Sequence, residues 1–192
     1  MGFLVLGLVL FLGVHSLRIF ADDWRAAQRA KMGEGPWKGV YSLVSIAGFA
    51  LIVWGYGETR MAPVNLWFPP VWTRHLAALL TVPAIVLLVA AYVPGNQLKA
   101  KVKHPMILAV KVWAFSHLLS NGRLSDVLLF GGFLVWAIAL FRSSRMRDRK
   151  NGVVYQGHSV PATAITVVVG LGLWALFTFF LHARWIGVAP LG

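Results

Sequence analysis

Two histidines, His104 and His117, stand thirteen positions apart in a stretch that is otherwise apolar and that also carries Lys111. Ionisable side chains at hydrocarbon depth are energetically costly, and those found there usually serve a function. Neutral imidazole is also a common ligand for haem iron and for other metals. This stretch is therefore the first place to look for a mechanism.

A helix through this stretch would present two different polar faces. Lys111 lies only about 20° around the helix from His104, whereas His117 lies about 140° from His104. The two histidines are also separated by about 20 Å along the axis, so they cannot hold one metal ion together. We expect His104 and Lys111 to form one polar face, suited to an anionic group. His117, with Trp113 and Asn121, forms the candidate ligand face.

The other candidate residues lie at or near the ends of apolar runs. His15 is about one helical turn from Arg18, and His75 opens a later run. All six acidic residues fall in connections or at the ends of runs, so Lys111 has no obvious acidic partner. This pattern argues against a carboxylate proton relay, a di-iron bundle and an ion-coupled transporter. A haem site, a quinone site, a proton path and plain interhelical hydrogen bonds all remain compatible with the histidines.

Composition indicates the elements that must position these residues. The chain has 192 residues, of which 58% are hydrophobic and 12% charged. Several apolar runs approach the roughly 20 residues that cross a bilayer, which predicts an all-α, polytopic transmembrane helix bundle with a single domain over 1–192. About six spans are expected, at 2–20, 37–56, 71–93, 105–121, 124–142 and 162–183. The fourth is the shortest and most polar, so we expect a re-entrant or interior helix there rather than one that faces lipid.

Basic residues alternate along the chain in a way that predicts orientation. Of 18 Lys and Arg residues, 13 lie in the three alternate connections 18–38, 94–104 and 142–160. By the positive-inside rule these connections are cytoplasmic, and both termini lie on the non-cytoplasmic side. The net charge of +12 therefore has a membrane explanation, with attraction to anionic lipid as a consequence and no nucleic acid required.

The first apolar run could also be a cleaved signal peptide. A signal peptide has basic residues before its apolar core, whereas here none precedes the run and Arg18 follows it. We therefore expect an uncleaved first helix. The chain has no cysteine, which excludes disulfides, iron–sulfur clusters and covalently attached c-type haem but leaves histidine-ligated haem open.

Five short motifs in a fixed order resemble those of the NnrU family, and the resemblance covers nearly the whole chain. The motifs lie at 14–18, 37–43, 72–75, 93–96 and 104–117. The resemblance implies a multi-pass protein of the bacterial inner (cytoplasmic) membrane, linked with denitrification and nitric oxide metabolism. Components of a nitrite or nitric oxide reductase are the partners that it implies, and a hydrophobic small molecule is a further candidate.

The same family includes the plant 15-cis-zeta-carotene isomerase, a haem b enzyme with a similar fourth span. This likeness implies haem b as the cofactor, with His15 and His117 as ligands of the haem iron. Arg18, Lys111 or both would then neutralise the haem carboxylates. Ala114 stands where the plant enzyme has an alternative cysteine ligand, so a switch to a sulfur ligand is impossible in this chain.

Depth along the spans suggests a different pairing of the histidines. His15 lies about five residues from the inner end of its span and His117 about thirteen, a difference of roughly 12 Å. Depth alone would pair His15 with His104 and His75 with His117. Two functions therefore stand as expectations: a haem-dependent redox or isomerase-like protein, and a non-enzymatic accessory protein for nitrite or nitric oxide reduction. Whether the chain is an enzyme is left open by its sequence.

Overall fold

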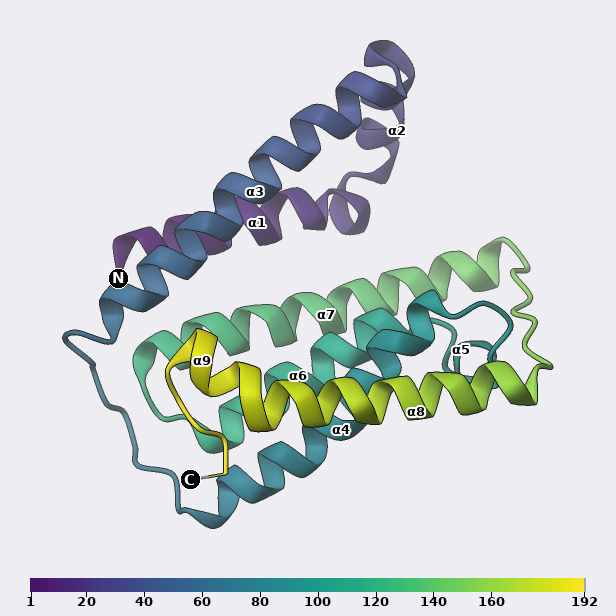
Figure 1. Ribbon diagram of the computed structural model, residues 1–192. Coiled ribbons are helices and arrows are strands. Elements are labelled where there is room, and N and C mark those ends of the chain that lie inside the picture. Colours follow the sequence, from purple (N-terminus) through teal and green to yellow (C-terminus); the bar gives the residue numbers. More distant parts are fainter. Residues whose placement is uncertain (192) are drawn as a thin grey trace.

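The computed structural model describes residues 1–191, and these form an all-helical bundle, as predicted (Figure 1). Five helices are long and apolar enough to cross a membrane. They are α1 (Gly2–Phe20), α3 (Glu34–Thr59), α4 (Trp72–Tyr92), α7 (Leu124–Lys150) and a last helix composed of α8 (Val160–Leu176), the π-helical turn η1 (Phe177–Leu181) and α9 (His182–Ile186). The sixth apolar helix is α6 (Pro105–Ser120), which has only 16 residues. Two short helices, α2 (Asp22–Met32) and α5 (Gln97–Val102), lie in the connections.

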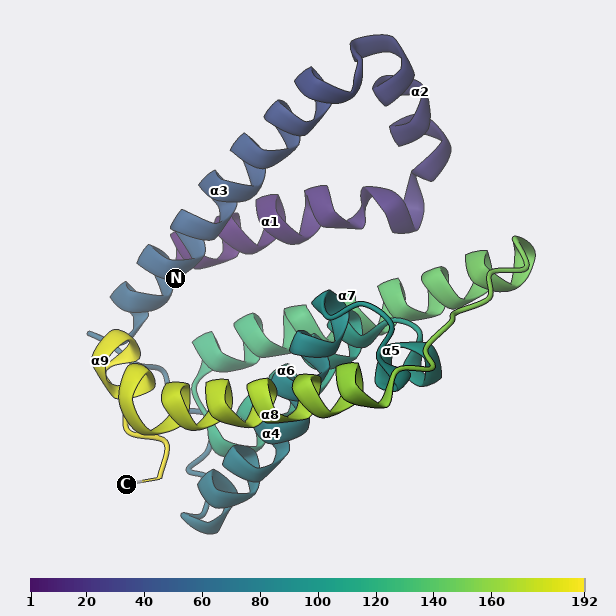
Figure 2. The same cartoon turned by 45° about the vertical axis from the view of Figure 1, so that its right-hand side comes forward.

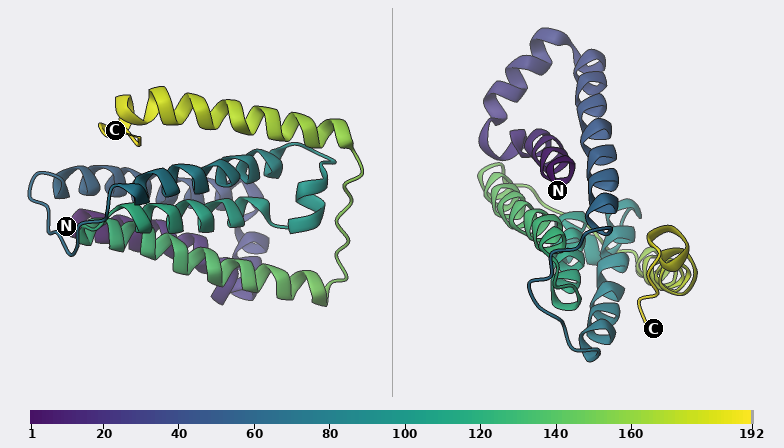
Figure 3. Two further views of the ribbon diagram at one scale, coloured as in Figure 1. Left: turned by 90° about the horizontal axis from the view of Figure 1, so that it is seen from below. Right: turned by 90° about the vertical axis from the view of Figure 1, so that its left-hand side faces the viewer.

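The helices pack in an order that differs from their order in the chain. Helix α1 contacts both α3 and α7, α6 lies against α7 and α4, and α8 covers the other side of α4. Figures 2 and 3 show α1 and α3 meeting near the N-terminus and diverging toward α2. Helix α6 lies between two neighbouring helices, although Met106 and Phe115 on it remain exposed, so its interior position is seen only in part.

Both ends of the described chain lie at one end of the bundle, and the three basic connections lie at the other. The N-terminus and α9 are at the same end in Figures 1 and 3, opposite α2, α5 and the connection after α7. This arrangement agrees with an even number of crossings. That the basic end faces the cytoplasm stays a prediction from the positive-inside rule.

Three glycines bring the backbones of α1 and α3 into contact. A Cβ at Gly7 would lie 2.6 Å from the backbone nitrogen of Ile52, and a Cβ at Gly48 would lie 2.8 Å from the nitrogen of Phe11. Gly55 is equally close to the backbone of Leu4. Helices in membranes pack through such small residues because lipid provides no hydrophobic drive for helix association. These glycines therefore fix how closely α1 approaches α3.

Large apolar side chains cover the outer surface of the bundle. Leu43 on α3 is 70% exposed and Val168 on α8 is 68% exposed. The buried positions are instead filled largely by small residues such as Ala90, Ala114 and Ala137. A water-soluble bundle would show the reverse pattern, so the structure supports a membrane protein whose outer face contacts lipid acyl chains.

An extended segment closes the end of α6. The backbone amides of Leu66 and Trp67 both donate hydrogen bonds to the carbonyl of Gly122, at 2.8 and 3.2 Å. The amide of Leu124 in turn donates to the carbonyl of Val64 at 2.9 Å. Gly122 has to be small, because a Cβ there would collide with the backbone of Trp67. The connection between α3 and α4 is thereby tied to the connection between α6 and α7.

Candidate functional site

His117 on α6 is held in a defined orientation by its own helix. Its Nδ1–H donates a hydrogen bond of 2.8 Å to the carbonyl of Trp113, one turn earlier. The imidazole stacks on the ring of Phe130 from α7, with ring centroids 4.6 Å apart. Because the proton resides on Nδ1, the lone pair of Nε2 is available, and Nε2 makes no hydrogen bond to residues 1–191.

His15 on α1 has the same local arrangement. Its Nδ1–H donates a 2.6 Å hydrogen bond to the carbonyl of Phe11, again one turn earlier, and its ring stacks on that of Phe11 at 4.2 Å. Tyr41 of α3 and Trp136 of α7 meet the imidazole edge-on, at 5.2 and 6.1 Å between centroids. His15 therefore lies where α1, α3 and α7 meet, with Nε2 making no hydrogen bond within the described chain.

One group of aromatic rings connects the two histidines. The ring of Phe133 on α7 lies 5.8 Å from Phe11 and 5.7 Å from Trp113, which are the residues that orient His15 and His117. We call this group the aromatic cluster; its members are Phe11, Trp113, Phe130, Phe133 and Trp136. The structure thus brings His15 and His117, from two helices, to the edges of one aromatic cluster.

Trp136 carries a polar group that the bundle leaves without a partner. Its indole Nε1–H is buried and finds no hydrogen-bond acceptor among residues 1–191. A buried N–H normally has a partner, because leaving it unpaired costs about 1–3 kcal/mol. Trp136 lies beside His15. This unpaired donor is therefore next to a residue that we consider a candidate metal ligand.

His104 and Lys111 share a face of α6, as predicted, but their surroundings differ from those of His15 and His117. The ring of Phe141 lies 6.0 Å from the His104 ring, and Lys111 Nζ sits 4.9 Å above the same Phe141 ring. His104 Nε2 is 2.8 Å from a carboxylate oxygen of Asp148, and Tyr155 O–H donates to that same oxygen at 3.1 Å. His104 therefore has a protein acid as its partner, which the sequence analysis did not anticipate.

This polar cluster of His104, Asp148 and Tyr155 joins α6, α7 and the connection after α7 at the basic end. Burial and the hydrogen bond to Asp148 raise the pKa of Tyr155, so its phenol remains a donor at neutral pH. The predicted span ended at residue 142, whereas α7 continues to Lys150 and carries Asp148 to His104. The partner was missed because the helix extends two turns past the apolar run.

We expect Asp148→Asn to loosen the connection at 151–159. The charge-assisted contact with His104 would be lost, so trypsin should cleave near Lys150 roughly fivefold to tenfold faster, as expected from hydrogen bonds contributing about 0.5–1.5 kcal/mol each. Tyr155→Phe should give a smaller increase. Asp23→Asn is the control, because Asp23 makes no side-chain hydrogen bond or ion pair with residues 1–191. Unchanged cleavage of the Asp148 variant would show that the cluster does not hold the connection.

The remaining candidates lie apart from the aromatic cluster. His75 is exposed near the start of α4, and its ring makes no hydrogen bond to the described residues. His104 has Asp148 as its hydrogen-bond partner, while the pairing of histidines by depth stays a prediction. Arg18 is exposed at the basic end of α1, where its backbone carbonyl accepts a hydrogen bond from Arg147.

Sequence reasoning also missed a buried acid at the opposite end of α7. Asp126 is only 2% exposed and accepts a 2.6 Å hydrogen bond from Tyr56 O–H on α3. Its other oxygen accepts from the backbone amide of Arg123 at 3.1 Å, which caps the helix start. An acid in the first turn of an apolar span could have indicated the cap, but nothing in the sequence indicates Tyr56 as its partner.

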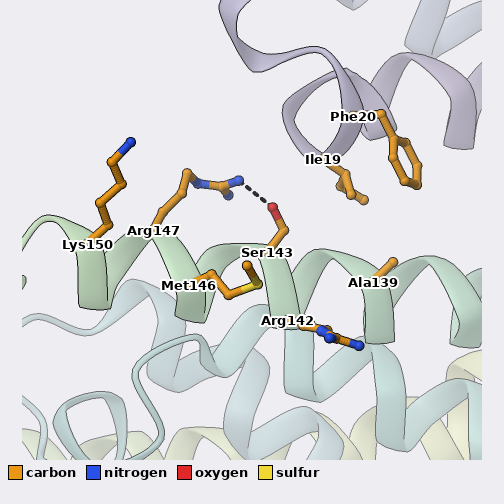
Figure 4. Close-up of a pocket in the computed structure, with 8 residues that line it drawn as sticks. All are labelled: Ile19, Phe20, Ala139, Arg142, Ser143, Met146, Arg147 and Lys150. Carbon is orange, nitrogen blue, oxygen red and sulfur yellow. Dashed lines mark hydrogen bonds between the residues drawn. The ribbon is translucent and has the colours of Figure 1, made fainter.

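A groove runs along the surface between α1 and α7. Its basic half has a volume of about 570 Å³ and its inner half about 400 Å³. Ile19, Phe20 and Ala139 line both halves, so the two are continuous. In Figure 4 Arg147 and Lys150 rise from α7 toward the end of α1. We call this hollow the α1–α7 groove.

Comparison with known proteins identifies the family. No curated protein and no solved structure gives a significant match to this chain. The family described as NnrU protein matches residues 3–190, which is nearly the whole chain and includes His15 and His117. The chain therefore belongs to the NnrU protein family.

Proposed function

We propose that this protein binds haem b within the membrane through His15 and His117 and uses it in redox chemistry. The observation that supports the proposal most strongly is that the two imidazoles make the same hydrogen bond, each to its own helix. Each donates Nδ1–H to a carbonyl of its own helix, and each keeps Nε2 free. A histidine that ligates a metal normally donates its other ring N–H in this way, which fixes the tautomer and the ring orientation.

The surroundings of the two histidines suit a flat, apolar ring system. The aromatic cluster supplies apolar contacts, and the unpaired Nε1–H of Trp136 could donate to an acceptor on a bound molecule. The ring of Phe133 lies against Phe11 and Trp113, the residues whose carbonyls orient the two imidazoles, so it borders the region where haem would bind. Haem iron already has four ring nitrogens as ligands, so one or two imidazoles complete its coordination.

Two cations, one on α6 and one on α1, are available to pair with the carboxylates of haem. Lys111 Nζ contacts the Phe141 ring and has no acidic partner among the described residues. Arg18 is exposed one turn beyond His15 at the basic end of α1. We therefore assign the neutralisation of the haem carboxylates to these two cations, while His15 and His117 hold the iron.

Within the site, the protein supplies ligand orientation and exclusion of water, while haem supplies one-electron chemistry when it is bound. The hydrogen bonds from His15 and His117 to helix carbonyls keep both Nε2 atoms oriented. Ala114 is buried with no exposed surface and offers no alternative ligand, so we infer a fixed histidine ligation. We place this activity in the bacterial inner membrane and in nitrogen oxide metabolism, on the family resemblance.

An absorption spectrum of the freshly purified protein tests the proposal. We expect a Soret band that shifts on reduction with dithionite, and a pyridine haemochrome spectrum of b type. A protein that stays colourless after purification and after incubation with excess haem would overturn the proposal and leave the accessory role as the better explanation. The histidine variants that locate the ligands are treated in the Discussion.

A further inference from the structure

We propose that the α1–α7 groove binds one anionic phospholipid, with an acyl chain along the groove and the headgroup at its basic end. This inference goes beyond haem binding and does not depend on it. Three observations carry it: the apolar lining, the position of the basic residues, and the length of the apolar part.

The lining of the groove changes from apolar to basic along α7. The inner half is bounded by residues such as Gly131, Val135 and Ala139, with Ile19 and Phe20 of α1 opposite. A Cβ at Gly131 would meet no atom within 4 Å, so this glycine leaves the surface open rather than admitting another helix. The inner half therefore offers a smooth apolar surface for an acyl chain.

Three cations define the other end of the groove: Arg142, Arg147 and Lys150. Arg147 is already engaged, since it donates to the carbonyl of Arg18 at 2.9 Å, to Ser143 at 2.7 Å and to Ser144 at 3.0 Å. Among residues 1–191, no acidic side chain lines either half. Arg142 and Lys150 therefore have charge to offer an anionic group, and each such cation near a membrane surface contributes about 1 kcal/mol to attraction for anionic lipid.

The length of the apolar part of the groove matches the hydrocarbon thickness of one leaflet of a bilayer. From Gly131 to Arg142 the helix rises by about 16 Å at 1.5 Å per residue. Half of a hydrocarbon core about 30 Å thick is about 15 Å. When the acyl chain lies beside the residues from Gly131 to Ala139, the phosphate is therefore level with Arg142, and Lys150 lies about 12 Å further along the helix, on the headgroup side.

The groove is a poor site for haem, although haem is also apolar with acidic groups. None of the six histidines lines either half, so no imidazole is available there to hold iron. The groove also lies along the surface between two spanning helices, where membrane lipid is the abundant amphiphile. We therefore assign it to lipid.

Native mass spectrometry of the protein in mild detergent tests this assignment. Dioleoyl phosphatidylglycerol and dioleoyl phosphatidylcholine are added in turn, because they share acyl chains and differ in charge. We expect the wild-type protein to retain the anionic lipid preferentially. The double variant Arg142→Gln with Lys150→Gln should lose roughly tenfold or more of this preference. Arg145→Gln with Arg149→Gln removes the same charge from the same helix outside the groove and should change little.

A second variant tests binding of the acyl chain separately from attraction of the charged headgroup. Ala139→Trp places a large side chain in both halves of the groove and should abolish retention of either lipid, whereas Ile138→Trp, outside the groove, should not. Glycerol phosphate in excess should fail to displace the phosphatidylglycerol, since it lacks the acyl chains. Equal retention of the two lipids by the wild type, displacement by glycerol phosphate, or loss of haem rather than lipid in the Arg142 and Lys150 variant would each overturn the proposal.

Discussion

Purified His117→Ala and His15→Ala proteins are each expected to lose the Soret band or to show it strongly altered. Each substitution removes one Nε2 that we assign to iron, while the stacking partners Phe130 and Phe11 remain in place. Loss of residues that only orient a ligand typically weakens metal binding 10- to 100-fold, so loss of the ligand itself should weaken haem retention by roughly that much or more. Absorption per mole of protein, before and after haem titration, measures the effect.

His75→Ala is the matched control for these variants. His75 is an exposed imidazole on a spanning helix and lies outside the aromatic cluster, so the spectrum should be unchanged. His104→Ala should also leave the Soret band in place, because His104 is paired with Asp148. If His104 or His75 proves necessary while His117 does not, the assignment of ligands is wrong. If all four variants resemble a coloured wild type, the haem is held elsewhere.

The second large effect that we expect is a loss of stability when the contact between α1 and α3 is disturbed. Gly7→Ala introduces a methyl group that would lie 2.6 Å from the nitrogen of Ile52 and 2.8 Å from the carbonyl oxygen of Gly48. Both neighbours are backbone atoms, so the two helices must move apart. Overpacking of this kind typically costs about 1–3 kcal/mol. We expect the apparent melting temperature of the detergent-solubilised protein to fall by several degrees, as monitored by size-exclusion chromatography after heating.

Gly13→Ala is the control for this experiment, and its expected effect on stability is opposite to that of Gly7→Ala. Gly13 lies on the same helix, and a Cβ there would meet nothing within 4 Å. Alanine favours helix over glycine by about 1 kcal/mol, so this variant should be as stable as the wild type or more stable. Equal melting temperatures for the Gly7 and Gly13 variants would mean that α1 and α3 are not in close contact in the membrane.

The pattern of hydrophobic runs was enough to predict the helices, because each span has to satisfy its backbone hydrogen bonds internally whatever its neighbours are. The partly interior position of α6 followed from the cost of exposing Lys111 and His117 to lipid. The glycine contacts of α1 and α3 did not follow, since Gly7 and Gly48 become informative only when the crossing point is known. Sequence order also gave no indication that α7 would lie between α1 and α6.

The candidate site, too, could be predicted from the sequence only in part. His15 and His117 were predicted as the principal ligands, and that assignment stays a prediction, while the structure adds that each is oriented by a carbonyl four residues earlier. The partner of His104 could not be predicted, because Asp148 lies 44 positions away, beyond the expected end of a span. Trp136 was missed for a different reason: an unpaired indole N–H is a property of packing, and no sequence pattern reports it.

The short helix α6 has a consequence for how the protein fits its bilayer. Sixteen residues rise only about 24 Å, which is about 6 Å less than a typical hydrocarbon core. For a helix facing lipid, such hydrophobic mismatch would be relieved by thinning the membrane around it. Here α6 lies between α4 and α7, and the backbone of Leu66 and Trp67 bonds to Gly122 just beyond its end. The turn that α6 lacks at this end is thus replaced by the backbone of the extended segment rather than by lipid.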